Sequence, residues 1–168
     1  LKEERSHTFS VSADMYHTFK NGIQGNLMVE GFYTILDDVF TLENEYIKTQ
    51  VLPEIGGKIL RGYDKVGEHD FIYYNEVIKP ALVGLAGAWI SGGIEFNWPQ
   101  HHRPTTYMPL EATAEENSDG GKTVWVGEVD PLNRMKGMAG ITVDKGRSYI
   151  KAKVRVYNRT AFPQVFMW

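Results

Sequence analysis

The segment that most constrains the fold is Tyr149–Tyr157, where the side chains alternate almost strictly in character. Four apolar residues occupy the even positions (Ile150, Ala152, Val154, Val156), and three basic residues occupy the odd positions between them (Lys151, Lys153, Arg155). Successive side chains of a β-strand point to opposite faces. The pattern therefore predicts a strand with one apolar face and one charged face, as in an antiparallel sheet that is covered on one side.

Further segments are rich in β-branched and aromatic residues and are separated by turns rich in Gly, Asn and Asp, a combination typical of short strands. No segment shows an amphipathic helical period over three turns. We therefore predict an all-β fold, an antiparallel sandwich or barrel, with hairpin turns at Asn117–Gly121 and Asp144–Arg147. The remaining predicted strands are Thr8–Ser12, Phe32–Leu36, Val39–Asn44, Tyr46–Leu52, Lys58–Tyr63, Asp70–Tyr74, Thr123–Val129 and Met138–Val143.

Length and composition exclude several classes of protein. The 168 residues suit one domain. The 18 basic and 21 acidic residues form no long run of either sign, so we expect no nucleic-acid partner. No apolar stretch approaches the roughly 18 residues of a membrane-spanning helix. The chain has no cysteine, which removes disulfides and thiolate chemistry and fits a cytoplasmic location. It lacks an initiating Met and stops within the apolar run Pro163–Trp168, so we expect a fragment of a longer protein.

The long connection between Asn75 and Met108 is the place to look for chemistry, because long ordered loops tend to be functional. It is rich in Pro and Gly, yet apolar. Within it, Gly92-Gly93 allows positive φ or a close approach of backbone or ligand. Carboxylates and amides pair with sugar hydroxyls, and an indole face covers the apolar side of a sugar ring. The candidate saccharide-binding residues of this loop are Glu95, Asn97, Trp98, His101, His102 and Arg103.

Each of these candidates also has a structural explanation. Glu95 could be a buried carboxylate paired with Arg103 or Arg134. His101 and His102 are adjacent, so in a strand they point apart and at least one has a structural or solvated role. Trp98 could simply belong to the core. The Glu and His spacing matches no common metal motif, and we expect neither a metal nor a cofactor.

Two arginines outside this loop are further candidates. Arg134, in the segment Asp130–Gly137, could line a second wall of the same pocket or form surface ion pairs in a solvated loop. Arg61, which follows Gly56-Gly57, could bind substrate or be a charge on a strand face. The Trp98-Pro99 bond is a plausible cis site, with trans as the default.

From about Phe40 onward the chain resembles the bacterial domain known as DUF5107, often found ahead of tetratricopeptide repeats. The most specific match is Gly92–His102, and the others are Leu42–Tyr46, Leu52–Ile59, Ser91–Pro104, Asp130–Gly137 and Tyr157–Thr160. That domain is similar to the galactose mutarotase superfamily, whose fold is an antiparallel β-supersandwich of about twice this length. The resemblance implies a lead segment over residues 1–30 and the N-terminal part of that sandwich over residues 31–168.

Mutarotases use a His as general acid and a Glu as general base. Phe162–Trp168 resembles the mutarotase strand that ends in the catalytic His, but this chain has Met167 and Trp168 there. Gly92–Pro99 resembles a stretch of the hexose-6-phosphate epimerases, which implies a pocket at this loop.

We therefore expect a carbohydrate-binding or carbohydrate-active domain. Glu95 and His101 or His102 would transfer protons in an epimerase, lyase or glycosidase-type step. The expected substrate-binding residues are Asn97, Trp98, Arg103, Arg134 and Arg61. The alternative is a non-catalytic scaffold or interaction domain of a repeat-containing protein. Open sheet edges would allow association of identical copies.

Overall fold

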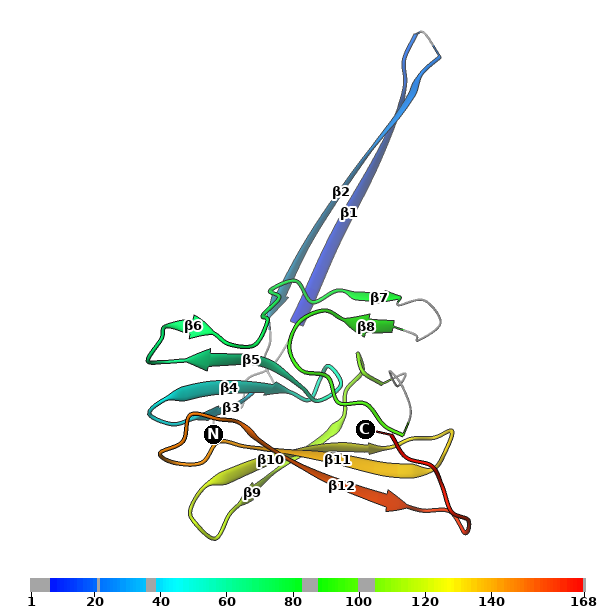
Figure 1. The fold of residues 1–168 in the computed structure, drawn as a ribbon. Helices are drawn as coiled ribbons and strands as arrows, with labels where there is room; N and C mark the ends of the chain where they lie inside the picture. Colours follow the sequence, from blue (N-terminus) through cyan, green and yellow to red (C-terminus); the bar gives the residue numbers. More distant parts are fainter. Residues whose placement is uncertain (1–6, 21, 36–38, 83–87, 100–104, 168) are drawn as a thin grey trace.

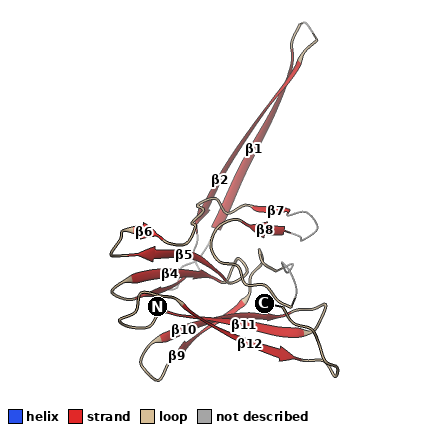
Figure 2. Cartoon of the chain, in the orientation of Figure 1, coloured by secondary structure: helices blue, strands red, loops and turns tan. Residues whose placement is uncertain are grey.

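The fold consists of two facing four-stranded sheets, from which a long hairpin projects (Figure 1). The computed structural model describes residues 7–20, 22–35, 39–82, 88–99 and 105–167. Every regular element in these ranges is a strand (Figure 2). The prediction of an all-β, antiparallel, sandwich-like fold is therefore confirmed.

The first sheet has the strand order β3-β4-β5-β6, and all its neighbours are antiparallel. Its strands are β3 (Phe40–Glu43), β4 (Ile47–Leu52), β5 (Lys58–Asp64) and β6 (His69–Asp70). The second sheet has the order β12-β11-β10-β9 and is also antiparallel. Its strands are β9 (Glu111–Glu116), β10 (Lys122–Val129), β11 (Met135–Thr142) and β12 (Lys151–Asn158).

The register of β12 confirms the alternation seen in the sequence. Val154 lies opposite Ala139 and Ala152 lies opposite Ile141, and both β11 partners are fully buried. Directly opposed residues of an antiparallel pair share a face, so the apolar side of β12 faces the sandwich interior. Val154 is nevertheless 39% exposed, because β12 is an edge strand.

The core between the sheets includes two side chains from the long connection. Trp98 is fully buried and Phe96 is 4% exposed, and both pack among apolar residues of the two sheets. Gly137 of β11 lies directly against the indole, because a Cβ at this position would come within 2.5 Å of the Trp98 ring. The sheet residues of this core cluster are Leu42, Ile47, Val51, Ile59, Val124, Val126, Ala139 and Ile141.

The remaining strands form two separate hairpins. One pairs β1 (His7–Thr18) with β2 (Gln24–Ile35), and the other pairs β7 (Pro80–Leu82) with β8 (Ala88–Ile90).

The strand predicted at Asp70–Tyr74 is wrong beyond Asp70. Further along β5, the backbone of Ile59 is hydrogen-bonded to Ile94. The chain after β6 therefore cannot continue to pair with this edge of β5.

Asn44 connects the two sheets at one end of the sandwich. Its Oδ1 accepts hydrogen bonds from the backbone N–H groups of Tyr46 and Ile47, each at 2.8 Å. Its Nδ2 donates to the carbonyl oxygens of Asp144 and Arg147 at 2.7 and 2.6 Å. One amide therefore fixes the β3–β4 turn and holds the β11–β12 loop against it.

We expect Asn44→Ala to lower the free energy of unfolding by about 2 kcal/mol, because backbone groups on both loops lose a partner. Asn44→Asp keeps the acceptor for the β3–β4 turn but loses the donor, so it tests the link between the sheets alone. Urea denaturation would measure both variants. Lys48→Ala, at an exposed position of β4, is the control and should stay within about 0.5 kcal/mol of the parent chain. An unchanged Asn44→Ala variant would contradict this role for Asn44.

Candidate functional site

The segment 92–99 is fixed against the edge of β5 by backbone hydrogen bonds. The N–H of Ile59 donates to the carbonyl of Ile94 at 3.0 Å, and the N–H of Ile94 donates back to Ile59 at 2.8 Å. The N–H of Gly93 also donates to the carbonyl of Tyr73 at 2.8 Å. The loop singled out in the sequence is therefore a bonded extension of the first sheet at this point.

Gly92 and Gly93 both have positive φ, 92° and 74°. A Cβ on Gly93 would lie 2.3 Å from the carbonyl oxygen of Ile59, and one on Gly92 would lie 2.9 Å from the backbone N of Asn75. This confirms the prediction that the glycine pair serves positive φ and close backbone approach.

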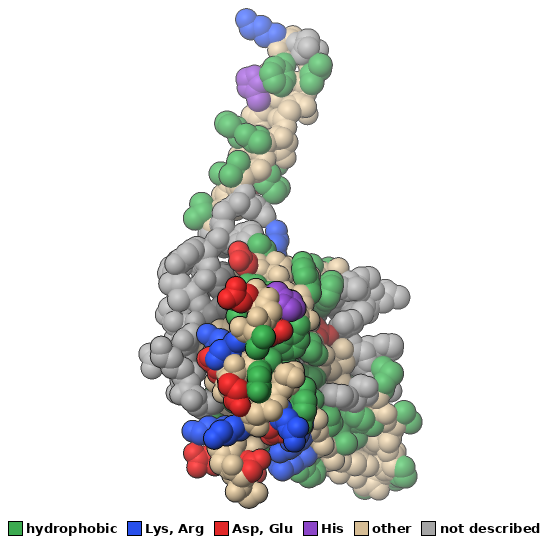
Figure 3. Space-filling model, turned by 60° about the vertical axis from the view of Figure 1, so that its left-hand side comes forward, with side chains coloured by type: hydrophobic (Ala, Val, Ile, Leu, Met, Phe, Trp, Pro, Cys, Tyr) green, Lys and Arg blue, Asp and Glu red, His purple; other side chains and the backbone are tan. Residues whose placement is uncertain are grey.

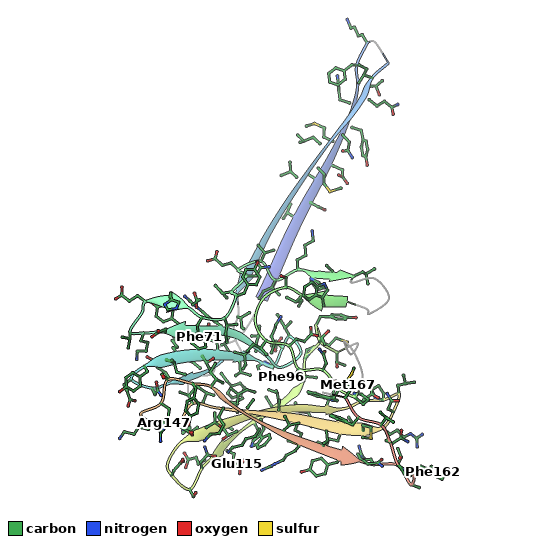
Figure 4. All side chains as sticks on the ribbon, in the orientation of Figure 1. Phe71, Phe96, Glu115, Arg147, Phe162 and Met167 are labelled. Atoms are coloured by element: carbon green, nitrogen blue, oxygen red, sulfur yellow. The ribbon has the colours of Figure 1, made fainter. Side chains whose placement is uncertain are left out.

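The side chains after Gly93 are divided between the core and the site. Phe96 and Trp98 point into the core, and Figure 4 shows Phe96 between the two sheets. Glu95 and Asn97 alternate with them and are half-buried, although one carboxylate oxygen of Glu95 and Oδ1 of Asn97 are inaccessible to solvent. Because Trp98 is fully buried, its indole belongs to the floor beneath the loop and has no exposed face for stacking. The Trp98-Pro99 bond is cis, in contrast to the default.

Lys58 is a site residue that the sequence analysis did not single out. One step along the antiparallel register from the Ile59–Ile94 bridge, Lys58 lies opposite Glu95. It is only 2% exposed, and its Nζ donates to the carbonyl of Ile90 at 2.7 Å. Burial lowers the pKa of Lys58, and the negative charge of Glu95 partly opposes that shift. The site therefore contains a buried cation and a carboxylate that act on each other.

The sequence held one signal for this lysine, namely its position directly after Gly56-Gly57 at the start of a buried strand. Both glycines have φ of 66°, and a Cβ on Gly56 would lie 2.3 Å from the carbonyl oxygen of Thr106. The glycine pair thus lets β5 begin directly under neighbouring backbone, which places Lys58 inside the protein. From the sequence alone, a lysine at this position is interpreted as the polar end of a strand. Its burial becomes apparent only when the segment that lies opposite it is known.

The C-terminal segment runs beside the same loop. The N–H of Met167 donates to the carbonyl of Pro99 at 2.7 Å, and Phe166 packs against the core cluster. The C-terminal segment therefore ends next to the loop that contains Glu95 and Asn97. In Figure 4 Met167 and Arg147 lie toward opposite ends of the sandwich.

Asn97 Oδ1 has no hydrogen-bond donor among the described residues, although it is buried. A buried acceptor without a donor is costly and calls for an explanation. A ligand hydroxyl or N–H at this position would satisfy it.

Arg61 has structural partners in this fold. Its Nε donates to Asp70 Oδ1 at 2.6 Å and its terminal nitrogen donates to Asp70 Oδ2 at 2.9 Å. The guanidinium carbon also lies 5.2 and 5.0 Å from the ring centres of Tyr63 and Tyr74. The hydrogen bonds to Asp70 are the main cause that raises the pKa of Arg61. The guanidinium of Arg61 therefore already donates two hydrogen bonds to the Asp70 carboxylate.

Arg134 lies in the turn between β10 and β11, which Asp130 organises. Asp130 Oδ2 accepts from the backbone and side-chain nitrogens of Asn133 at 2.5 and 2.8 Å, and the N–H of Arg134 donates to the Asp130 carbonyl at 2.8 Å. Arg134 has a φ of 55°, and its side chain is exposed. It lines a depression with Arg159 and Gln164, and neither Glu95 nor Asn97 belongs to that depression.

The predicted residues His101, His102 and Arg103 lie outside the described residues. Among the candidates that are described, Glu95, Asn97 and Trp98 come together on one segment, with Lys58 added from β5. Arg61 and Arg134 are each held in other local networks.

The family described as "Domain of unknown function (DUF5107)" matches this chain over residues 30–168. This range includes both sheets and the whole candidate site. The chain belongs to the DUF5107 family. The match begins within β2, so it contains part of the projecting hairpin.

One solved structure shares the fold of this DUF5107 chain: a TPR-domain containing protein from Parabacteroides distasonis ATCC 8503, with a TM-score of 0.66 and 19% identity. The alignment covers 92% of the present chain and 29% of the other, so this chain spans less than a third of that protein. Within the described ranges, no helix is long and apolar enough to cross a membrane.

We expect Gly93→Ala to destabilise the protein more than Gly120→Ala. Both positions have positive φ, 74° and 80°, so both variants carry a strain of roughly 1–2 kcal/mol. Only Gly93 adds a collision with backbone, because a Cβ on Gly120 would meet nothing within 4 Å. Thermal unfolding of the two variants measures the difference. Equal melting temperatures would contradict the close packing of the loop on β5.

Lys58 should give the protein a distinctive dependence on alkaline pH. Its pKa is lowered from 10.5 in the fold, so the unfolded chain binds more protons between that lowered pKa and 10.5. Stability from this group therefore rises with pH across that window. Denaturation from neutral pH to about pH 10.5 should show this rise in the parent chain relative to Lys58→Met, where it is absent. Parallel pH profiles would rule out a burial-lowered pKa.

Proposed function

We propose that this DUF5107 chain is a carbohydrate-recognition domain whose ligand site is the loop around Glu95 and Asn97. The observation that carries the proposal is the buried Asn97 Oδ1, which lacks a hydrogen-bond donor among the described residues. Two positions before it is Glu95, which lies opposite the buried Lys58. Amide and carboxylate oxygens are suitable acceptors for the hydroxyl groups of a sugar.

Each group has a defined role in this proposal. Asn97 Oδ1 is closed to solvent in this structure, so a ligand hydroxyl donates to it only after it displaces the groups that cover this oxygen. The Glu95 carboxylate accepts a hydrogen bond from a neighbouring hydroxyl. The Glu95 carboxylate lies opposite the buried Lys58, one step from the Ile59–Ile94 bridge. Trp98 and Phe96 hold both acceptors in place from below, since they fix the alternate positions of the segment in the core.

The finer form of the proposal is a mutarotase-like site. In that form Glu95 and His101 or His102 transfer protons to and from the ring oxygen and the anomeric hydroxyl. Arg103 would add a contact to the ligand, and Arg61 would do so only after release from Asp70. Arg134 would reach only a ligand large enough to extend into the separate depression that it lines. We also propose a cytoplasmic location, on the absence of cysteine.

A second candidate is an interaction domain. Its support is the projecting hairpin with exposed apolar side chains, together with the similarity in fold to a TPR-domain containing protein. In this case the chain would serve as a β-rich neighbour of helical repeats.

Ligand-induced melting shifts across a panel of mono- and oligosaccharides test the first proposal. A bound sugar at a hundredfold excess over its Kd should stabilise the chain by about 2.7 kcal/mol. Asn97→Leu, which removes the acceptor at similar volume, should weaken binding at least about tenfold, and Glu95→Gln should weaken it too. Glu116→Gln on the exposed face of β9 is the control and should bind as the parent does. A panel without any shift would refute saccharide recognition at this loop.

A further inference from the structure

The β10–β11 turn and the segment after β12 lie at the same end of the second sheet. Met135 lies opposite Asn158 in the last pair of the β11–β12 ladder. Arg134 precedes Met135 and Arg159 follows Asn158, so the two arginines occupy the next position of this register, across from each other. Both line the depression that also contains Gln164, which has a volume of about 500 Å³. Like charges at opposed positions repel each other, so this pair is unfavourable in the free chain.

The two guanidinium groups have no acidic partner within the described residues. Neither forms an ion pair or a side-chain hydrogen bond with any residue in that part of the chain. The acidic residue nearest to Arg134 in the sequence is Asp130, which is 6% exposed and whose Oδ2 accepts two hydrogen bonds from Asn133. The described lining of the depression therefore contains two positive charges and no negative charge.

The backbone at Arg134 also supports a role for its side chain. Its φ of 55° is a left-handed conformation, which is unfavourable for a residue other than glycine. The turn imposes this conformation, since the N–H of Arg134 donates to the carbonyl of Asp130 and the N–H of Asp130 donates to the carbonyl of Met135, each at 2.8 Å. A glycine would fit this position without strain. An arginine here costs the fold stability, which a bound anion would offset.

A second depression, at the opposite end of the sandwich, differs in its charge. It has a volume of about 760 Å³ and is lined by as many acidic as basic side chains, Arg147 among them. Figure 3 turns this end toward the viewer and shows Lys and Arg side chains interspersed with Asp and Glu. Arg147 and Phe162, which lines the first depression, lie toward opposite ends in Figure 4. Of these two depressions, only that of Arg134 and Arg159 has an excess of positive charge.

We propose that Arg134 and Arg159 bind the phosphate group of a small phosphate monoester. Such a group carries a charge of about −1.5 to −2 at pH 7, which matches the charge of two arginines. Guanidinium groups also donate paired hydrogen bonds to phosphate oxygens, and an anion between the two arginines removes their mutual repulsion. A depression of this volume is of the size that holds small molecules.

The rim of the depression offers apolar contacts to the organic part of the ligand. Leu132 is 86% exposed and Phe162 is 74% exposed, and both line the depression. The proposal is independent of the saccharide site, because neither Glu95 nor Asn97 lines this depression. Either proposal can therefore fail without the other.

An NMR titration of the ¹⁵N-labelled 168-residue chain with phenyl phosphate at low salt tests the proposal. We expect saturable binding with a dissociation constant of about 1 mM or lower, and the largest shift changes at residues 131–134 and 159–164. Arg134→Gln and Arg159→Gln should each weaken binding at least about tenfold. Arg147→Gln makes the same change in net charge at the other end of the sandwich and should leave the dissociation constant within about twofold.

Arg134→Gly separates loss of the guanidinium from damage to the turn. It relieves the strained φ, so this variant should melt at or above the temperature of the parent chain and still lose binding at least about tenfold. Phenol, which lacks the phosphate, should not bind measurably, and benzoate, with a single charge, should bind at least about fivefold more weakly than phenyl phosphate.

Four results would each overturn the proposal. They are a parent chain that does not saturate at about 10 mM phenyl phosphate, arginine variants that bind as the parent does, and benzoate that binds as tightly as phenyl phosphate. The fourth is a phosphoserine peptide that binds at least about tenfold more tightly than phenyl phosphate, because it would assign the depression to a phosphorylated protein.

Discussion

The pair of hydrogen bonds between Ile59 and Ile94 is the interaction on which the rest of the structure depends. It converts a long Pro- and Gly-rich connection into a short continuation of the first sheet, and the close approach that it requires is available only because residue 93 is glycine. Beyond this bridge the chain is extended, so successive side chains point to opposite sides. Phe96 and Trp98 enter the core, and Glu95 and Asn97 are held on the other side. Without the bridge, neither the indole between the sheets nor the polar groups of the candidate site would have a fixed position.

The same bridge explains why a lysine is buried. An apolar residue at position 58 would fill the space beneath the loop with less desolvation, and a buried ion pair is in general weak evidence for stability. The Lys58 ammonium is instead retained, bonded to the carbonyl of Ile90 and facing the charge of Glu95. Its charge interaction with Glu95 is local, because the two residues lie opposite each other one step from the Ile59–Ile94 bridge.

The sequence predicted the parts of this protein that depend on local pattern. The apolar face of Tyr149–Tyr157, the hairpin turn at Asn117–Gly121 and the role of Gly92-Gly93 each follow from alternation or turn chemistry and are confirmed. The parts that depend on which strands meet could not be predicted. Lys58 became a site residue only through its register with Glu95, and Arg61 acquired partners only through the return of Asp70 along β5. The hairpin of β1 and β2 extends well beyond the short strand Thr8–Ser12, because pairing in register sustains residues with little strand preference of their own.

The contrast between the centre and the periphery of the molecule bears on how it works. In the centre, both sheets and the loop share one core cluster, and backbone hydrogen bonds hold the polar groups above it. At the periphery, apolar side chains are exposed within the described residues on β1–β2, where Val11 is 73% exposed, and on the inner side of β12, where Val156 is 45% exposed. Apolar area that is exposed in an isolated chain becomes a source of free energy on association. The described part of the chain therefore combines a centre that is fixed by backbone hydrogen bonds with outer strands whose apolar side chains are open to contact.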